Sequence, residues 1–158
     1  MTIVPRLRAA LVGGLVVAAI GAAATPGEAT VPGAAEKARA AMVQERQALH
    51  ALPQATASGS GSYARPLTHV RAATTDLLAV QAAIADAARA TGTFPHIASI
   101  QGLLDSALAG TGGASTQLSA AVWYIDHGVP AGSTVVPQAR SDLRQALKAS
   151  TALAKLLG

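Results

Sequence analysis

Residues 66–90 read PLTHVRAATTDLLAVQAAIADAARA, and this stretch decides the fold class. Its larger apolar residues recur mostly three or four positions apart, which places them along one face of a helix. A proline at the first position and Gly92 just beyond the last are typical of a helix start and a helix end. The apolar stripe of this predicted amphipathic helix consists of Leu67, Val70, Leu77, Leu78, Ile84 and Ala88.

Four further segments have the same spacing, and no run of six residues alternates with the period of a strand. Gly110 and Gly128 follow two of these segments and are interpreted as helix ends. Short connections favour antiparallel neighbours, so we expect an all-α, up-and-down bundle of four to five helices. The helices are predicted at 32–52, 66–90, 95–109, 115–127 and 137–157.

The segment 53–65 contains SGSGS and is predicted to be a flexible loop. It joins the first predicted helix to the rest of the bundle. The helix at 32–52 is therefore expected to be the most detachable member of a single helical domain over residues 30–158.

The composition agrees with helices rather than sheets. Of the 158 residues 51% are hydrophobic but only 3% aromatic, and about a quarter are alanine, the strongest helix former. The chain has no cysteine, which excludes disulfides and thiolate metal sites. So few aromatic residues also exclude a stacking platform for single-stranded nucleic acid.

The N-terminus is typical of a signal peptide. Arg6 and Arg8 precede an uncharged apolar run over residues 9–24, and small residues follow. We predict that residues 1–29 include this leader and that cleavage follows Ala24 or Ala29. The run is shorter than the ~20 residues of a spanning helix, so a permanent anchor is the weaker interpretation. The sequence predicts export to a periplasmic or extracellular location.

Removal of the leader changes the charge. The net charge of +4 falls to +2 after Ala24 because Arg6 and Arg8 are lost; cleavage after Ala29 also removes Glu28 and gives +3. A general affinity for nucleic acid therefore loses its main support, and we expect no nucleic-acid partner.

Four polar residues fall within predicted apolar stripes: Glu45, Thr74, Gln81 and Ser150. Glu45 is the most informative, since burying a carboxylate is unfavourable unless it is paired. Three interpretations are open for it: exposure to water on a partly covered helix, a polar core network with Gln81, or a functional carboxylate with a raised pKa.

No catalytic or metal-binding spacing is present. His50, His69, His96 and His127 form no H-x-x-x-H or E-x-x-H pair, and neither a G-x-S-x-G nor a phosphate-loop motif occurs. We therefore expect a non-enzymatic protein with no metal and no cofactor. His96 or Tyr63 could in principle be an axial haem ligand, although their spacing gives no support.

The last predicted helix carries cations along one edge of its leucine face, within about 80° of one another. Such an edge is typical of either a solvated helix flank or a site for anionic lipid headgroups, envelope polymers or an acidic partner. The residues are Arg140, Arg144, Lys148 and Lys155.

Trp123 and Tyr124 are the one pair of aromatic residues that are consecutive in the sequence. Trp123 lies about 130° from the centre of the apolar face of its predicted helix. The pair belongs either to a second packing face or to a partner contact.

The function expected from these features is contact with an envelope component, an anionic surface or a partner protein, with at most peripheral membrane contact. The alternative is a carrier that holds haem or an apolar molecule between its helices, with Glu45, Gln81 and His96 as polar anchors.

Overall fold

The computed structural model describes residues 31, 33–52, 59–92, 94, 96–129 and 134–158. The regular secondary structure in these ranges is entirely helical, with no strand, which confirms the all-α prediction. The predicted leader and both cleavage positions lie outside the described residues. The four helices are α1 (Ala34–Ala51), α2 (Gly61–Thr91), α3 (Ile97–Asp126) and α4 (Val135–Leu156).

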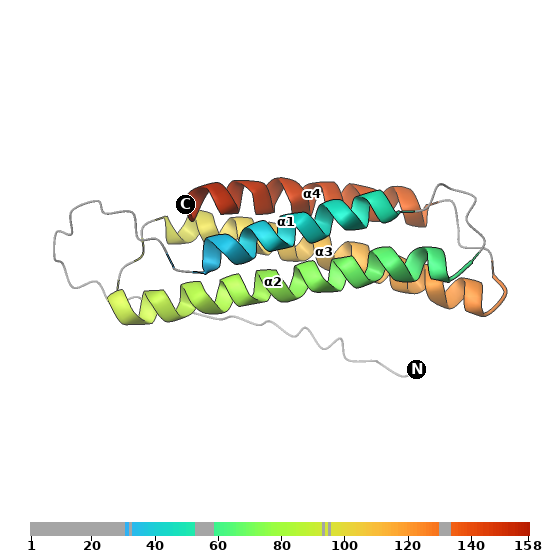
Figure 1. Ribbon diagram of the computed structural model, residues 1–158, viewed down its shortest axis with the longest axis horizontal. Helices are drawn as coiled ribbons and strands as arrows, with labels where there is room; N and C mark the ends of the chain where they lie inside the picture. Colours follow the sequence, from blue (N-terminus) through green and yellow to red (C-terminus); the bar gives the residue numbers. More distant parts are fainter. Residues whose placement is uncertain (1–30, 32, 53–58, 93, 95, 130–133) are drawn as a thin grey trace, which may run out of the picture.

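The helices form an elongated bundle in which consecutive helices run in opposite directions (Figure 1). α1 packs against α2 and α4, and α3 packs against the same two helices. The first and last helices of the chain are therefore neighbours, and the bundle closes through the contact between α1 and α4.

The prediction of separate helices at 95–109 and 115–127 is wrong, because α3 runs without interruption from Ile97 to Asp126. A Cβ atom at Gly110 would lie 2.6 Å from the carbonyl oxygen of Asp142 and 2.9 Å from the Cβ of Ala146. Gly110 thus allows α3 to approach the backbone of α4 closely. This packing keeps the helix continuous where glycine alone would favour an end.

α2 begins at Gly61, five residues before the predicted start at Pro66, so the predicted loop 53–65 is wrong for residues 61–65. Residues 53–58 of that loop lie outside the described ranges. Tyr63 is buried in the same apolar cluster as Leu67, and this burial stabilises the extra turn. Pro66 lies in the second turn of α2, where its missing N–H means that the hydrogen bond to the carbonyl of residue 62 is not made.

The core consists of two apolar clusters, one towards each end of the bundle. On α1 the first cluster includes Ala41 and the second Ala48, and on α3 they include Ala107 and Ala114. The boundary between the clusters therefore crosses the middle of the bundle. Three buried polar residues lie at this boundary and are called here the polar layer: Glu45, Thr111 and Ser150.

Candidate functional sites

Glu45 lies in the middle of α1 and is 0% exposed. The Ser150 hydroxyl of α4 donates a hydrogen bond to Glu45 Oε1 over 2.8 Å. The second carboxyl oxygen, Oε2, is buried and has no hydrogen-bond partner among the described residues. The interpretation that Glu45 is exposed to water is therefore wrong. Its hydrogen-bond donor is Ser150, which also fell within a predicted apolar stripe.

Burial raises the pKa of Glu45 from 4.5 to about 7, and the hydrogen bond from Ser150 opposes part of this rise. Near neutral pH the carboxyl group is consequently divided between its protonated and ionised forms. Thr111, the third residue of the polar layer, donates to the Leu108 carbonyl of its own helix over 3.2 Å and brings no charge to the layer.

The other two predicted polar anchors do not join Glu45. Gln81 on α2 is exposed, so the predicted core network with Gln81 is wrong. His96 is also exposed, at the N-terminal end of α3, in the left-handed conformation with φ 60°. The three side chains proposed as anchors of a carried ligand therefore do not converge on one site. Thr74 satisfies its hydroxyl locally by donating to the Val70 carbonyl.

The four predicted cations of α4 lie on the outer side of the helix, opposite its buried residues. Ser150 marks the side of α4 towards α1, and Asp142, beside Gly113, marks the side towards α3. At about 100° per residue, Arg140 and Arg144 lie nearer in angle to Ser150 than to Asp142, Lys155 lies midway between the two, and Lys148 lies nearer to Asp142. Arg140 is half-buried and the other three, Arg144, Lys148 and Lys155, are exposed.

Two arginines of α1, which the sequence did not single out, extend this arc onto the neighbouring helix. The Arg39 guanidinium donates to the Gly158 carbonyl oxygen over 2.7 Å, so Arg39 lies on the α4 side of α1. Arg46 follows after two helical turns and shares that side. We define the cationic face as Arg39, Arg46, Arg140, Arg144, Lys148 and Lys155.

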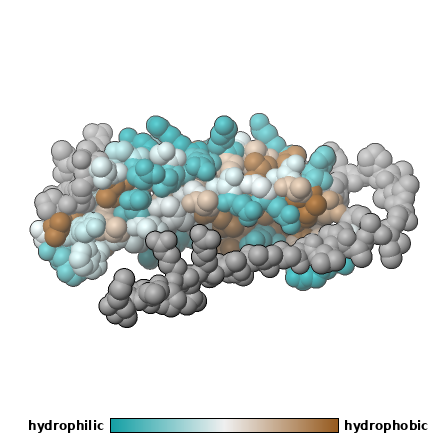
Figure 2. Space-filling view, turned by 180° about the vertical axis from the view of Figure 1, so that it is seen from behind, coloured by the Kyte–Doolittle hydropathy of each residue, from teal (hydrophilic) through white to brown (hydrophobic). Residues whose placement is uncertain are grey.

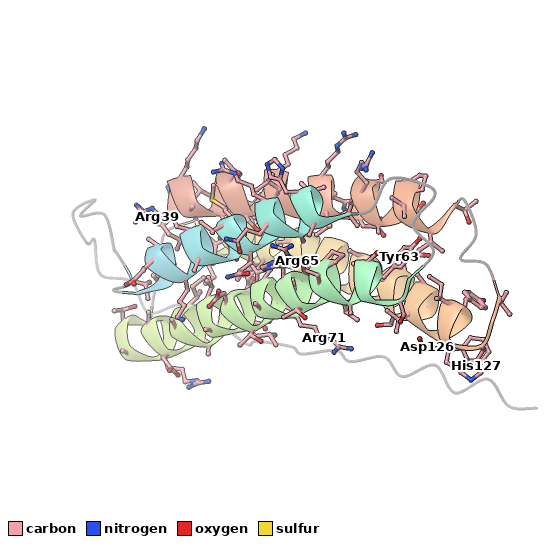
Figure 3. The ribbon with its side chains drawn as sticks, turned by 45° about the vertical axis from the view of Figure 1, so that its right-hand side comes forward. Arg39, Tyr63, Arg65, Arg71, Asp126 and His127 are labelled. Carbon is pink, nitrogen blue, oxygen red and sulfur yellow. The ribbon has the colours of Figure 1, made fainter. Side chains whose placement is uncertain are left out.

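The acidic side chains of the same two helices lie away from the centre of this face. Glu36 is in the first turn of α1, Glu45 is in the core, and Asp142 is beside α3. Side chains that end in nitrogen project outward along α4, and Arg39 is seen between α1 and α4 (Figure 3). In the view from behind, the edge formed by α4 is mostly hydrophilic (Figure 2). By contrast, α3 contains two aspartates and no lysine or arginine.

The aromatic pair is exposed at the C-terminal end of α3. Trp123 is 55% exposed, so the prediction of a second packing face is wrong for it, and Tyr124 meets its ring edge-on. His127 stacks on Trp123 with ring centroids 4.2 Å apart, and its Nδ1 lies 2.7 Å from the Trp123 carbonyl oxygen. This hydrogen bond assigns the proton to Nδ1 and fixes the orientation of the imidazole.

The described residues contain no group of three His, Asp or Glu side chains placed to hold a metal ion. Within those same residues, no helix has the length and apolarity that crossing a membrane requires. Tyr63, one of the two residues considered for haem, is buried within the apolar core.

No protein-family model, curated protein or solved structure matches the chain.

Proposed function

We propose that this protein is an exported, non-enzymatic helical bundle that contacts anionic groups of the cell envelope through its cationic face. The N-terminal leader pattern supports export to the periplasm or the cell exterior. The observation that carries the binding proposal is the gathering of six cations on the adjacent outer sides of α1 and α4, where the one exposed acidic side chain among the described residues is that of Glu36, next to Arg39 at the end of the face.

The shape of the cationic face fits an extended anionic partner. Residues 140 to 155 of α4 span roughly 22 Å along the helix axis. Phosphate or carboxylate groups presented in a row or a plane could meet several of these cations at once. Electrostatic attraction of this kind contributes about 1 kcal/mol for each Lys or Arg near an anionic membrane surface, and added salt weakens it.

A binding experiment with matched variants tests this proposal. Mature protein is mixed with vesicles that contain phosphatidylglycerol, with vesicles of phosphatidylcholine alone, and with soluble polyglutamate, and the bound fraction is measured by sedimentation or anisotropy. The double variant Arg144→Gln/Lys148→Gln removes two cations of the cationic face. The control, Arg71→Gln/Arg89→Gln, removes two exposed cations of α2, where Arg71 lies on the opposite side of the bundle from α4 (Figure 3).

We expect binding to the phosphatidylglycerol vesicles in low salt, with an affinity about 30-fold lower for the Arg144→Gln/Lys148→Gln variant and little changed for the control. Binding of polyglutamate without binding of vesicles would identify a polymer rather than a lipid surface. Equal losses in the two double variants, or no binding to any of the anionic probes, would contradict the proposal.

A further inference from the structure

Two residues of the polar layer, Glu45 and Ser150, lie on the interior sides of the two helices that carry the cationic face. Arg46 follows Glu45 in the sequence of α1, whereas Lys148, two residues before Ser150, lies about 160° from it around α4. The hydrogen bond from Ser150 to Glu45 therefore spans the interface between the two helices that together carry the cationic face.

Besides Glu45, α1 is held by few large buried groups. Met42 and Leu49 are only partly buried against the core, and Lys37, Arg39 and Gln44 make polar contacts to Asp76, Gly158 and His69. The buried residues of α1 are four alanines and Glu45, with Val31 and Leu52 buried just outside its two ends. An alanine side chain buries little apolar surface, so each contributes little to holding α1 in place. The one large side chain buried within the helix is the carboxylic acid, and its ionisation has a correspondingly large influence on the position of α1.

The groups on the helices around Glu45 do not neutralise its charge. α2 contributes His69, whose ring bonds Gln44, and Asp76, which pairs with Lys37. α3 contributes the uncharged Thr111, with Asp105 and Asp126 exposed.

On α4, Ser150 is the donor, Arg144 and Lys148 point outward into solvent, and Asp142 is beside α3. On α1 itself, Arg46 and His50 are exposed. No cation contacts Oε2, which has no hydrogen-bond partner in the described part of the chain. An ionised Glu45 thus has one donor and no counter-ion in an apolar interior.

We propose that Glu45 is a proton-dependent contact that regulates the cationic face: protonated Glu45 keeps α1 seated against α4, and ionised Glu45 releases α1 and separates the two halves of the face. This inference rests on the function proposed above, because the binding it regulates is that of the cationic face. It predicts tighter binding of an anionic surface at lower pH, since binding and protonation favour the same arrangement of α1.

The first test compares wild type with Glu45→Gln on phosphatidylglycerol vesicles at pH 5.5 and pH 8.5. The lipid charge is constant over this range, and the four histidines are common to both proteins. The gain in vesicle affinity from pH 8.5 to pH 5.5 is expected to be at least about threefold larger in the wild type than in Glu45→Gln. The reason is that only the wild type has an ionisable side chain in the polar layer. Equal gains in the two proteins would assign the effect to the histidines and overturn the inference.

The second test measures amide hydrogen exchange of α1 without any ligand, after correction for the intrinsic effect of pH on exchange. From pH 5.5 to 8.5, protection of α1 amides in the wild type is expected to fall at least about tenfold more than in Glu45→Gln, and more than protection of α3. Identical behaviour of the two proteins in α1 would overturn the inference even if vesicle binding is normal.

The variant Ser150→Ala keeps the carboxylic acid and removes its donor, so it provides a check that does not depend on folding of Glu45→Gln. Because the hydrogen bond lowers the pKa of Glu45, its removal is expected to move the midpoint of the exchange transition to higher pH. An unchanged midpoint would count against the inference. Failure of all vesicle binding with a normal exchange transition would reject the proposed function and leave the release of α1 supported.

Discussion

Ser150 donates a hydrogen bond over 2.8 Å to Glu45, a residue 105 positions earlier in the chain, and this bond joins the last helix to the first. Because it is made in the interior, it fixes which residues of α1 and α4 lie opposite one another. The two apolar clusters of the core meet at this level, so the carboxyl group lies at the middle of the bundle rather than at one of its ends.

The stability of the fold is expected to fall as the pH rises. Burial raises the pKa of Glu45 from 4.5 to about 7, so the folded state binds the proton more tightly than the unfolded state. The stabilisation is fully present below pH 4.5 and is lost as the pH rises to about 7, by an amount of about 3 kcal/mol. Urea unfolding of wild type and Glu45→Gln between pH 4.5 and 8 measures this loss. A variant with the same pH profile as the wild type would show that Glu45 is not responsible.

Two glycines of α3 are expected to respond in opposite directions to alanine. At Gly110 an added methyl group would meet the backbone of α4, so Gly110→Ala is expected to destabilise the fold by about 1–3 kcal/mol. At Gly112 nothing lies within 4 Å, and Gly112→Ala is expected to stabilise the helix by about 0.5–1 kcal/mol. Thermal unfolding of the two variants measures both effects. Equal changes would mean that α3 and α4 do not approach closely at Gly110.

Trp123 is expected to contribute little to stability. Its side chain is 55% exposed, so Trp123→Ala should change the free energy of unfolding by less than about 1 kcal/mol. Leu118 is on the same helix and is fully buried, and Leu118→Ala should destabilise the fold by about 2–5 kcal/mol. Chemical unfolding of both variants provides the comparison. A loss at Trp123 as large as that at Leu118 would identify Trp123 as a core residue and remove it as a contact candidate.

The sequence was sufficient for the helical class and for recognising Glu45 and Ser150, because both fall at apolar positions of a 100° repeat. It could not pair them, since the partner of a buried group depends on which helices become neighbours. For the same reason the sequence could not assign Arg39 and Arg46 to the cationic face, because that assignment depends on α1 lying beside α4.

Two of the wrong predictions, the burial of Gln81 and the end of a helix at Gly110, have identifiable causes. The buried line of α2 in its second half runs through Leu77, Val80 and Ile84, whereas the predicted stripe included the exposed Leu78. Including Leu78 shifted the predicted apolar face around the helix towards Gln81. In the structure, Gln81 lies about 70° from the mean direction of the buried residues Leu77, Val80 and Ile84. Gly110 was interpreted from its local preference, and its packing against α4 is a tertiary effect that no local pattern contains.

Glu45 is inferred to be a buried, proton-sensitive contact at the interface between α1 and α4. Carbon-13 NMR of the glutamate side-chain carboxyl groups tests it most directly, because the chain contains only three glutamates, at positions 28, 36 and 45. Glu45→Gln assigns the resonance by its disappearance. The assigned resonance is expected to titrate with a midpoint near pH 7, and a midpoint near the ordinary value of 4.5 would contradict this role of Glu45.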